Sequence, residues 1–272
     1  MAMRSRSSTA PGAGDHHRRR RSSARRRVLR PGEGHAGLSD VGRRRAVNQD
    51  AYLASSQLLV MADGVGGGPA GEVAARLAVE AFAAGASAAR TAADLRALAA
   101  AASAAVWDAA RADESLAGMA TTLTAGLFVP EGLAVVHAGD SRLYRVRGGA
   151  LEQLTEDHSF VDQLLREGLI APERAATHPL RNMLTRALGR DRDTDFDAFV
   201  VAVDPGDMFL VCTDGLTKMV DDAAIASVVA GAGSLDDAAL RLVRAANAAG
   251  GRDNVTVALA TAPRAMEDRA AA

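Results

Sequence analysis

Cysteine, aromatic residues and long apolar runs are all scarce in this chain of 272 residues. The single cysteine, Cys212, allows no internal disulfide and no zinc site built from cysteines. Aromatic residues make up 3% of the sequence, so a core must consist mainly of Ala, Val and Leu. No apolar run approaches the roughly 20 residues of a membrane-spanning helix, and the Arg-rich start lacks the apolar stretch of a secretory signal. The sequence therefore predicts a cytoplasmic protein with no membrane span.

Lysine is also nearly absent, because Lys218 is the only one and arginine supplies every other basic side chain. The net charge of -1 hides an asymmetry: residues 1–30 hold ten arginines and one acid, which leaves a net charge of -10 for the rest. A basic segment with so few apolar residues is predicted to be disordered, and contact with nucleic acid, an acidic partner or an anionic membrane stays open. We expect an Arg-rich extension over 1–35, one folded domain over 36–263 and a flexible tail over 264–272.

Short apolar runs joined by short turns predict a sheet framework. Strands are expected at 58–62, 121–129, 133–137, 143–146, 151–154, 196–203, 208–212 and 255–260. Helices are expected at 72–84, 91–113, 222–230 and 235–248, with Thr91 as the N-cap of the second and Asp94 three residues on. The segment 32–50 is polar and rich in turn residues, and 156–190 is interpreted as a helical excursion between strands. Because hairpins join antiparallel strands whereas parallel strands need long crossovers, the pattern predicts an α+β fold with helices outside the sheets.

Four aspartates lie at the ends of these predicted strands: Asp63, Asp140, Asp214 and Asp253. Asp63 and Asp214 are each followed by glycine, which is ordinary turn chemistry when it occurs once. A strand that is apolar along its whole length is buried on both faces, so each carboxylate is held near the edge of a core. Carboxylates that converge repel one another unless a positive group lies among them. Hard divalent cations with oxygen ligands are the simplest candidates.

Three other features suggest chemistry of a different kind. Residues 66–71 fit G-x-G-x-x-G between a strand and a helix, the context of a dinucleotide site, but no second strand ends in an acid about 20 residues further on. We interpret these glycines as a turn that lets the backbone approach an ion or phosphate.

Cys212 lacks the C-x5-R pattern of cysteine phosphatases and is predicted to be a core residue. His158 and His178 are expected to be surface or structural residues, with proton transfer as the alternative.

Seven motifs occur in order along the chain. They are D-x-G-x-x-R-x-x-N-x-D from Asp40, A-D-G-x-G-G-x-x-x-G-E from Ala62, G-D-S-R from Gly139, D-H-S from Asp157, H-P-x-R-N-x-L-T-R-A-L-G from His178, T-D-G-L from Thr213 and G-R-D-N-V-T-V from Gly251. With these motifs the chain resembles the metal-dependent serine/threonine protein phosphatases of type 2C, in their bacterial form, over about residues 37–262. The resemblance implies a four-layer α/β/β/α sandwich of two antiparallel sheets with helices on the outer faces.

The resemblance also implies a metal centre with two to three Mg²⁺ or Mn²⁺ ions. Asp63 matches the carboxylate that bridges two metals, and the Gly64 carbonyl matches a further ligand. Asp214 and Asp253 match the other direct ligands. Asp50 matches a position that reaches the metals largely through bound water. Hydrolysis in this family uses a metal-activated water and forms no phosphoenzyme.

Further positions of the family match this chain, and two depart from it. Asp140 matches an acid that helps to bind a third metal, Arg45 matches the phosphate-binding arginine, and residues 155–190 match a flap beside the active site. Gln49 stands where the family usually has glutamate. Val65 stands where eukaryotic members carry a histidine proposed as the general acid.

The function implied is therefore hydrolysis of phosphoserine and phosphothreonine in proteins, with Arg45 and Asp63 as catalytic residues. The expected partners are phosphorylated proteins, namely substrates of a serine/threonine kinase and the kinase itself. No nucleic acid is required, and the catalytic domain is compatible with a monomer. The alternative is a pseudophosphatase that binds phosphoproteins without turnover, and Gln49 is the only feature of the sequence that favours it.

Overall fold

Ten strands form two five-stranded sheets in the computed structural model, which describes residues 34–65, 70–175 and 177–263. The first sheet has the strand order β1 (His35–Asp40), β10 (Val255–Thr261), β9 (Met208–Cys212), β6 (Arg142–Arg147) and β7 (Ala150–Gln153). The second has the order β2 (Asp50–Ala54), β3 (Leu58–Asp63), β4 (Leu123–Val129), β5 (Gly132–Ala138) and β8 (Asp197–Val201). All neighbouring strands are antiparallel, as the sequence predicts.

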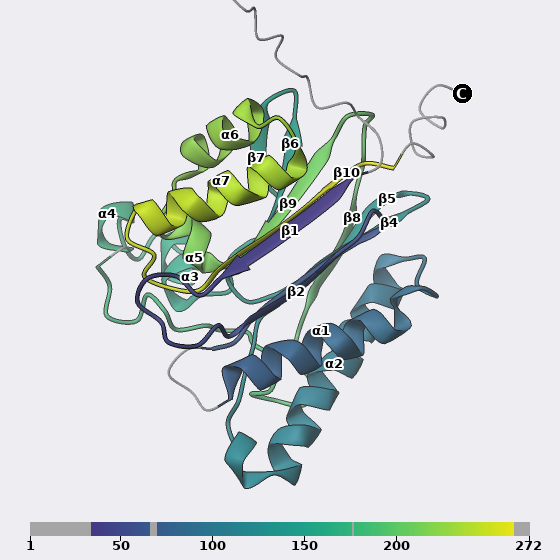
Figure 1. Cartoon of the computed structure of the whole chain (residues 1–272). Coiled ribbons are helices and arrows are strands. Elements are labelled where there is room, and N and C mark those ends of the chain that lie inside the picture. The colour runs from purple at the N-terminus through teal and green to yellow at the C-terminus, as the bar shows by residue number, and fades with distance from the viewer. Residues whose placement is uncertain (1–33, 66–69, 176, 264–272) are drawn as a thin grey trace, which may run out of the picture.

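The two sheets lie face to face, and helices cover the outer face of each (Figure 1). On the second sheet, α1 (Gly71–Ala86) contacts β2 and β3, and α2 (Ala92–Ala112) contacts β5 and β8. On the first sheet, α7 (Leu235–Ala248) contacts β1 and β10, and α6 (Asp222–Gly231) contacts β7. The predicted four-layer α/β/β/α sandwich is therefore confirmed.

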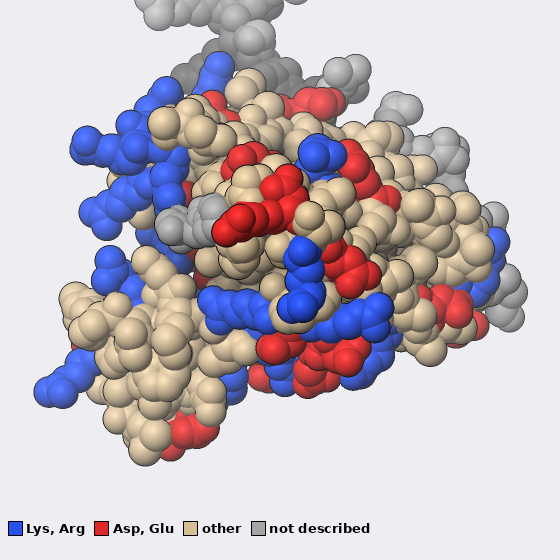
Figure 2. Space-filling model, turned by 90° about the horizontal axis from the view of Figure 1, so that it is seen from below, with Lys and Arg blue, Asp and Glu red and all other residues tan. Residues whose placement is uncertain are grey.

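The surface carries charges of both signs. On the face seen from below, Lys and Arg side chains adjoin Asp and Glu side chains, and neither sign forms a continuous field (Figure 2). Within the described ranges, none of the helices is long and apolar enough to cross a membrane.

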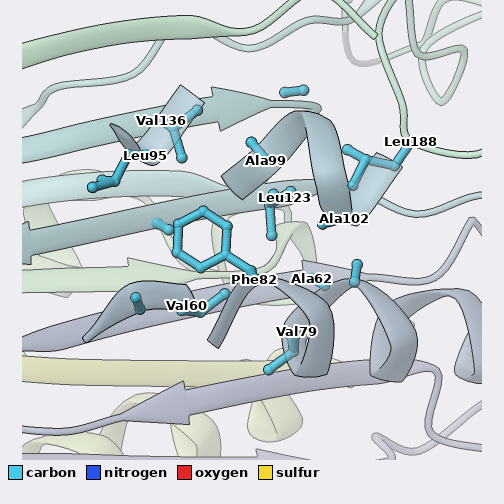
Figure 3. Close-up of a cluster of buried hydrophobic side chains, with 14 of the residues drawn as sticks. Val60, Ala62, Val79, Phe82, Leu95, Ala99, Ala102, Leu123, Val136 and Leu188 are labelled. Atoms are coloured by element: carbon cyan, nitrogen blue, oxygen red, sulfur yellow. The ribbon is translucent and has the colours of Figure 1, made fainter. Parts of the chain in front are cut away.

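The core is divided into layers by the alternation of side chains along the strands. On β3, Leu58, Val60 and Ala62 pack toward α1 and α2, whereas Leu59 and Met61 pack between the two sheets. This period of two follows from strand geometry. Figure 3 shows the layer under the helices. Because both faces of β3 are buried, its carboxyl end is rigidly held.

Alanine replaces the missing aromatic residues where α1 meets the sheet. Ala74, Ala75 and Ala78 are fully buried there, together with Phe82. Small side chains let the helix approach the sheet closely, and the one large ring fills the remaining space. The next helix begins at the predicted cap: the Thr91 hydroxyl accepts a hydrogen bond from the backbone of the third helical residue, whose side chain bonds back to the Thr91 backbone.

The described residues of the segment predicted as a helical excursion form two short helices, α3 (Phe160–Arg166) and α4 (Pro172–Ala175), and otherwise turns, isolated bridges and irregular chain. Backbone hydrogen bonds join its two arms, from Phe160 N to Met183 O at 2.8 Å and from Thr185 N to His158 O at 2.8 Å. These bonds give the segment a fixed base beside the sheet ends.

The prediction that 32–50 is a turn-rich segment is wrong over 35–40, which form β1. This strand lies at the edge of its sheet, and only Ala36 and Leu38 pack toward the core beneath α7. Two apolar residues are too few to show an alternating pattern, and pairing with β10 determines the structure instead. The sequence also misses β2 and the short helices α5 (Asp214–Thr217) and η1 (Glu114–Leu116).

Three predicted features lie outside the described residues: the Arg-rich extension before residue 34, the glycines of the fingerprint-like pattern at 66–68, and the tail over 264–272. What the sequence predicts for them stays a prediction.

Candidate active site

Strand ends bring the predicted carboxylates to one end of the sandwich. Asp63 is the last residue of β3, and its register partner across the antiparallel pair is Asp50, the first residue of β2. Asp214 opens α5 directly beyond β9, and Asp253 lies just before β10. Asp140 lies in the turn between β5 and β6. Neighbouring strands of both sheets thus deliver five acids to the same region.

A pocket of about 90 Å³ lies between these acids. It is lined by Arg45, Asp63, Gly64, Val65, Thr122, Asp140, Asn182, Leu184, Asp214, Lys218 and Asp253. The sites of cofactors and drug-sized ligands usually enclose roughly 300–1,000 Å³. This pocket is therefore suited to ions and a phosphoryl group, not to a dinucleotide.

Asp50 lies beneath the pocket and does not line it. One of its carboxylate oxygens, Oδ2, accepts hydrogen bonds from the hydroxyls of Thr213 at 3.0 Å and Thr256 at 2.5 Å. The other, Oδ1, is buried without a hydrogen-bond partner. Burial raises the pKa of Asp50 to about 7, and repulsion from Asp214 and Asp253 adds to the rise while the two hydroxyls oppose it. An orphaned anionic oxygen is costly and calls for a positive or water-borne partner.

Asp63 and Asp140 are destabilised as anions for the same reasons. Burial raises the pKa of Asp63 well above its usual range, and the charges of Asp50, Asp214, Asp140 and Asp253 raise it further. Burial and the charge of Asp214 raise the pKa of Asp140 to about 7. The carboxylates therefore need more positive charge than the protein supplies.

Two basic side chains from the protein lie among the acids. Arg45 donates from Nη2 to Asp253 Oδ2 at 2.8 Å, and the Lys218 ammonium binds Asp214. Among the described residues, no three acids, histidines or cysteines lie close enough together to form a ready-made metal site. Instead, Arg45 pairs with Asp253, and Lys218 lies between Asp140 and Asp214.

The donor set nevertheless fits hard divalent cations. Every acid at the site offers carboxylate oxygens, the ligands that Mg²⁺ and Mn²⁺ prefer. Four acids line the pocket together with two cations, Arg45 and Lys218. The free Oδ1 of Asp50 adds an acceptor that no protein donor reaches.

A tight turn holds Asp63 and Gly64 in place. The Asp63 backbone N–H donates to the Thr122 hydroxyl at 2.9 Å, and Gly64 N donates to Gln49 O at 3.0 Å. A Cβ on Gly64 would lie 2.4 Å from the backbone of Gly71. Only glycine fits this close approach, which leaves the Gly64 backbone at the wall of the pocket.

The loop that carries Arg45 is fixed by a residue that the sequence reasoning missed. The buried Asn254 donates from Nδ2 to Val41 O and to Val47 O, each at 2.9 Å, and its Oδ1 accepts from Gln49 N at 2.9 Å. These bonds span more than 200 positions of sequence. The motif G-R-D-N-V-T-V contains Asn254 and could have indicated it.

Other pocket residues that no prediction named are Thr122, Asn182, Leu184 and Lys218. Thr213 and Thr256, which bind Asp50, were also missed. Thr213 directly precedes Asp214, and Thr256 comes three residues after Asp253, so their motifs carried a signal. Asn182 lies within the motif that starts at His178, and Lys218 lies four residues after Asp214, but only the fold brings Asn182 to Lys218.

Gln49 does not face the pocket. Its Nε2 donates to Glu72 Oε2 at 3.0 Å, at the start of α1, and it is absent from the residues that line the pocket. The departure from glutamate at this position therefore leaves the pocket's carboxylates unchanged. Glutamate there would place a second carboxylate beside Glu72.

The remaining candidates lie away from the chemistry. His158 is buried, accepts a hydrogen bond from Gly139 N at 3.2 Å and contacts Asp197 at 3.1 Å. Its pKa is lowered by burial and by the nearby Arg186. Neither His158 nor His178 lines the pocket. Cys212 is fully buried beneath the helices of the first sheet, and burial raises the pKa of its thiol.

Comparison with known proteins agrees with this geometry. A family model described as protein phosphatase 2C matches residues 41–250. The chain belongs to this family. It is 39% identical to the serine/threonine protein phosphatase PstP of Mycobacterium tuberculosis over 233 residues, which cover 83% of this chain. These residues span only 44% of the length of PstP.

A shorter relative and a solved structure extend the comparison. The chain is 35% identical to the serine/threonine phosphatase stp of Listeria welshimeri, over 81% of this chain and 92% of the relative. It superimposes with a TM-score of 0.75 on the crystal structure of the PstP catalytic domain in complex with two manganese ions, at 38% identity. That match covers 84% of this chain and 97% of the solved one. The predicted family and fold are confirmed.

Proposed function

We propose that this chain is a metal-dependent protein serine/threonine phosphatase that hydrolyses phosphoserine and phosphothreonine directly. The observation that carries the proposal is the pocket itself, where buried and partly buried carboxylates from both sheets lie beside an arginine. The excess of anionic oxygens, including the free Oδ1 of Asp50, supports bound cations. The relatives are named serine/threonine phosphatases, which supports hydrolysis of phosphoserine and phosphothreonine.

The residues that would hold two Mg²⁺ or Mn²⁺ ions are Asp63, the Gly64 carbonyl, Asp214 and Asp253. Asp50, which lies deeper, would bind water that reaches the ions. Asp140 is the acid that the resemblance gives to a third ion. When bound, such ions would supply positive charge that lowers the pKa of a water molecule toward neutrality. The protein keeps this water close to the phosphorus and opposite the leaving oxygen.

Arg45 is proposed to bind the phosphate. Its side chain is 37% exposed and pairs with Asp253, so it can turn to a ligand when that carboxylate takes a metal. A guanidinium fork matches two phosphate oxygens and offsets the charge that develops on them. The water oxygen bonds to phosphorus as the bond to the serine or threonine oxygen breaks, and no bond between enzyme and phosphate forms.

The proton for the leaving oxygen comes from water in this proposal. Val65 occupies the position of the eukaryotic histidine, and its side chain packs against Ala120, Leu184 and Ala187. No histidine belongs to the described lining of the pocket. We assign this proton to water in the open pocket.

The pseudophosphatase reading loses its only support. Gln49 was the single feature in its favour, and its side chain binds Glu72 rather than the pocket. Asp63, Asp214 and Asp253 all line the pocket, and none is substituted.

Hydrolysis of a phosphothreonine peptide in Mn²⁺ by matched variants tests the proposal. Asp63→Asn removes one charge from the pocket and is expected to abolish turnover. Asp108→Asn is the control, because Asp108 lies on α2 with a side chain 62% exposed and away from the pocket. Full activity of Asp63→Asn would contradict the assignment.

We also propose phosphorylated products of a serine/threonine kinase, and that kinase itself, as substrates in a cytoplasmic setting, with the catalytic domain acting as a monomer. The charges of both signs on the face in Figure 2 suit protein surfaces better than the uniform phosphate backbone of nucleic acid. Dephosphorylation of the purified kinase in vitro tests the proposed substrates, and failure to act on any phosphorylated protein would contradict them. Gel filtration of the protein tests the oligomeric state, and elution as a dimer would contradict the proposed monomer.

A further inference from the structure

Lys218 is the only lysine of the chain, and its side chain lines the pocket of the predicted metal ligands. Arginine supplies the other 31 of the 32 basic residues. The two side chains differ in shape, since an ammonium is a compact charge with three donors and a guanidinium is a planar fork. The compact ammonium of lysine suits a position on which several oxygens converge.

Three oxygens surround the Lys218 ammonium. It donates to Asp214 Oδ2 and, at 3.2 Å, to Asn182 Oδ1, and it lies 3.7 Å from Asp140 Oδ2. The side chains of Asp140 and Asp214 are only 11% and 13% exposed. The ammonium thus contacts two acids that are largely shielded from water, in the way that a metal ion would.

The backbone places this cation in front of the acids. Asp214 is the first residue of α5, and Lys218 follows one helical turn later, so the two side chains lie on the same side of the helix. Lys218 N also donates to Asp214 O at 2.8 Å. The pairing with Asp214 is therefore a consequence of the local fold.

We propose that the Lys218 ammonium takes the place of a third metal ion between Asp140 and Asp214, so that this chain binds two divalent ions and not three. The inference rests on the proposed function, because it concerns the same metal centre. A divalent ion on these two carboxylates would lie close to the ammonium, and like charges repel strongly where water is partly excluded. The same ammonium holds Asn182, in the 155–190 flap, against the pocket.

The number of Mn²⁺ ions bound per chain tests the inference. It is measured by equilibrium dialysis and elemental analysis, for the wild type, Lys218→Gln and Lys218→Arg. Lys218→Gln keeps much of the length and a donor but loses the charge, and Lys218→Arg keeps the charge as the matched control. We expect two ions for the wild type and Lys218→Arg, as in the related crystal structure, and a third ion for Lys218→Gln. A third ion in the wild type, or none gained by Lys218→Gln, would overturn the inference.

Asp140→Asn gives an independent answer in a chain that keeps Lys218. If Asp140 pairs with the ammonium, this variant binds as many Mn²⁺ ions as the wild type. The loss of one ion on Asp140→Asn would show that Asp140 is a metal ligand and overturn the inference. Thermal unfolding of each variant confirms that it is folded. A folded wild type that binds no Mn²⁺ would overturn the proposed function as well, which a third ion would not do.

Discussion

Asn254→Ala is expected to loosen the loop of Arg45 and to weaken phosphate binding. Asn254 is buried and makes three hydrogen bonds, two to the carbonyls of Val41 and Val47 and one from Gln49 N. Alanine cannot replace any of these bonds. Because Arg45 lies between Val41 and Val47 in sequence, the loop loses one hydrogen bond on each side of Arg45 and keeps the bond from Arg43 N to Gly251 O.

The size of the effect follows from these bonds. Each contributes about 1 kcal/mol net, so the free energy of unfolding should fall by about 3 kcal/mol. For a domain of this size that corresponds to a Tm lower by roughly 6–12 °C. A charge-assisted hydrogen bond contributes about 1.5–3 kcal/mol, and losing about 1.4 kcal/mol of it raises the KM for a phosphopeptide about tenfold.

The assay combines thermal unfolding with kinetics on a phosphothreonine peptide in Mn²⁺. Ser103→Ala is the control, since the buried Ser103 on α2 makes one hydrogen bond, to the Thr194 hydroxyl at 2.8 Å. It should lower the free energy of unfolding by about 1 kcal/mol and leave KM unchanged. If Asn254→Ala lowers Tm as expected but keeps the wild-type KM, Asn254 does not position Arg45.

Three further predictions concern the surroundings of the pocket. Gln49→Glu should cost about 1 kcal/mol of stability, because it loses the bond to Glu72 and adds a like charge, while kcat stays unchanged; a large fall in kcat would contradict the geometry. Gly64→Ala should lower Tm and activity together, since its Cβ would lie 2.4 Å from the backbone of Gly71; a wild-type Tm would show that the turn can open. Burial raises the folded-state pKa of Asp50 to about 7, so between its usual pKa of about 4 and this value the native chain holds a proton that the unfolded chain has lost. In EDTA the stability should therefore fall as pH rises from about 4 to 7. Mn²⁺ should restore Tm most at the higher pH, and a Tm in EDTA that rises with pH would refute this.

The sequence predicts those parts of the fold that depend on local pattern. The buried run of β3 followed by Asp63 and Gly64 could be read directly, because a strand buried on both faces is apolar throughout. The N-cap of α2 at Thr91 could also be predicted, because it depends only on residues three positions apart in sequence. The roles of the acids came from the resemblance of seven motifs, not from the residues alone.

What the sequence does not show depends on contacts between distant segments. The edge strand β1 has only two inward apolar residues, and its partner β10 lies more than 200 positions away. Asn254 and Lys218 gain their importance from loops that reach them only in the folded chain. The orientation of Gln49 toward Glu72 likewise became visible only in the structure.

The most direct test of the central claim is the metal dependence of the wild-type protein. Purified, folded protein is incubated with a phosphothreonine peptide in EDTA, and then with Mn²⁺ or Mg²⁺ in excess of the chelator. We predict no phosphate release in EDTA and steady release once metal is added. Equal release in both conditions, or none with any metal, would contradict a metal-dependent phosphatase.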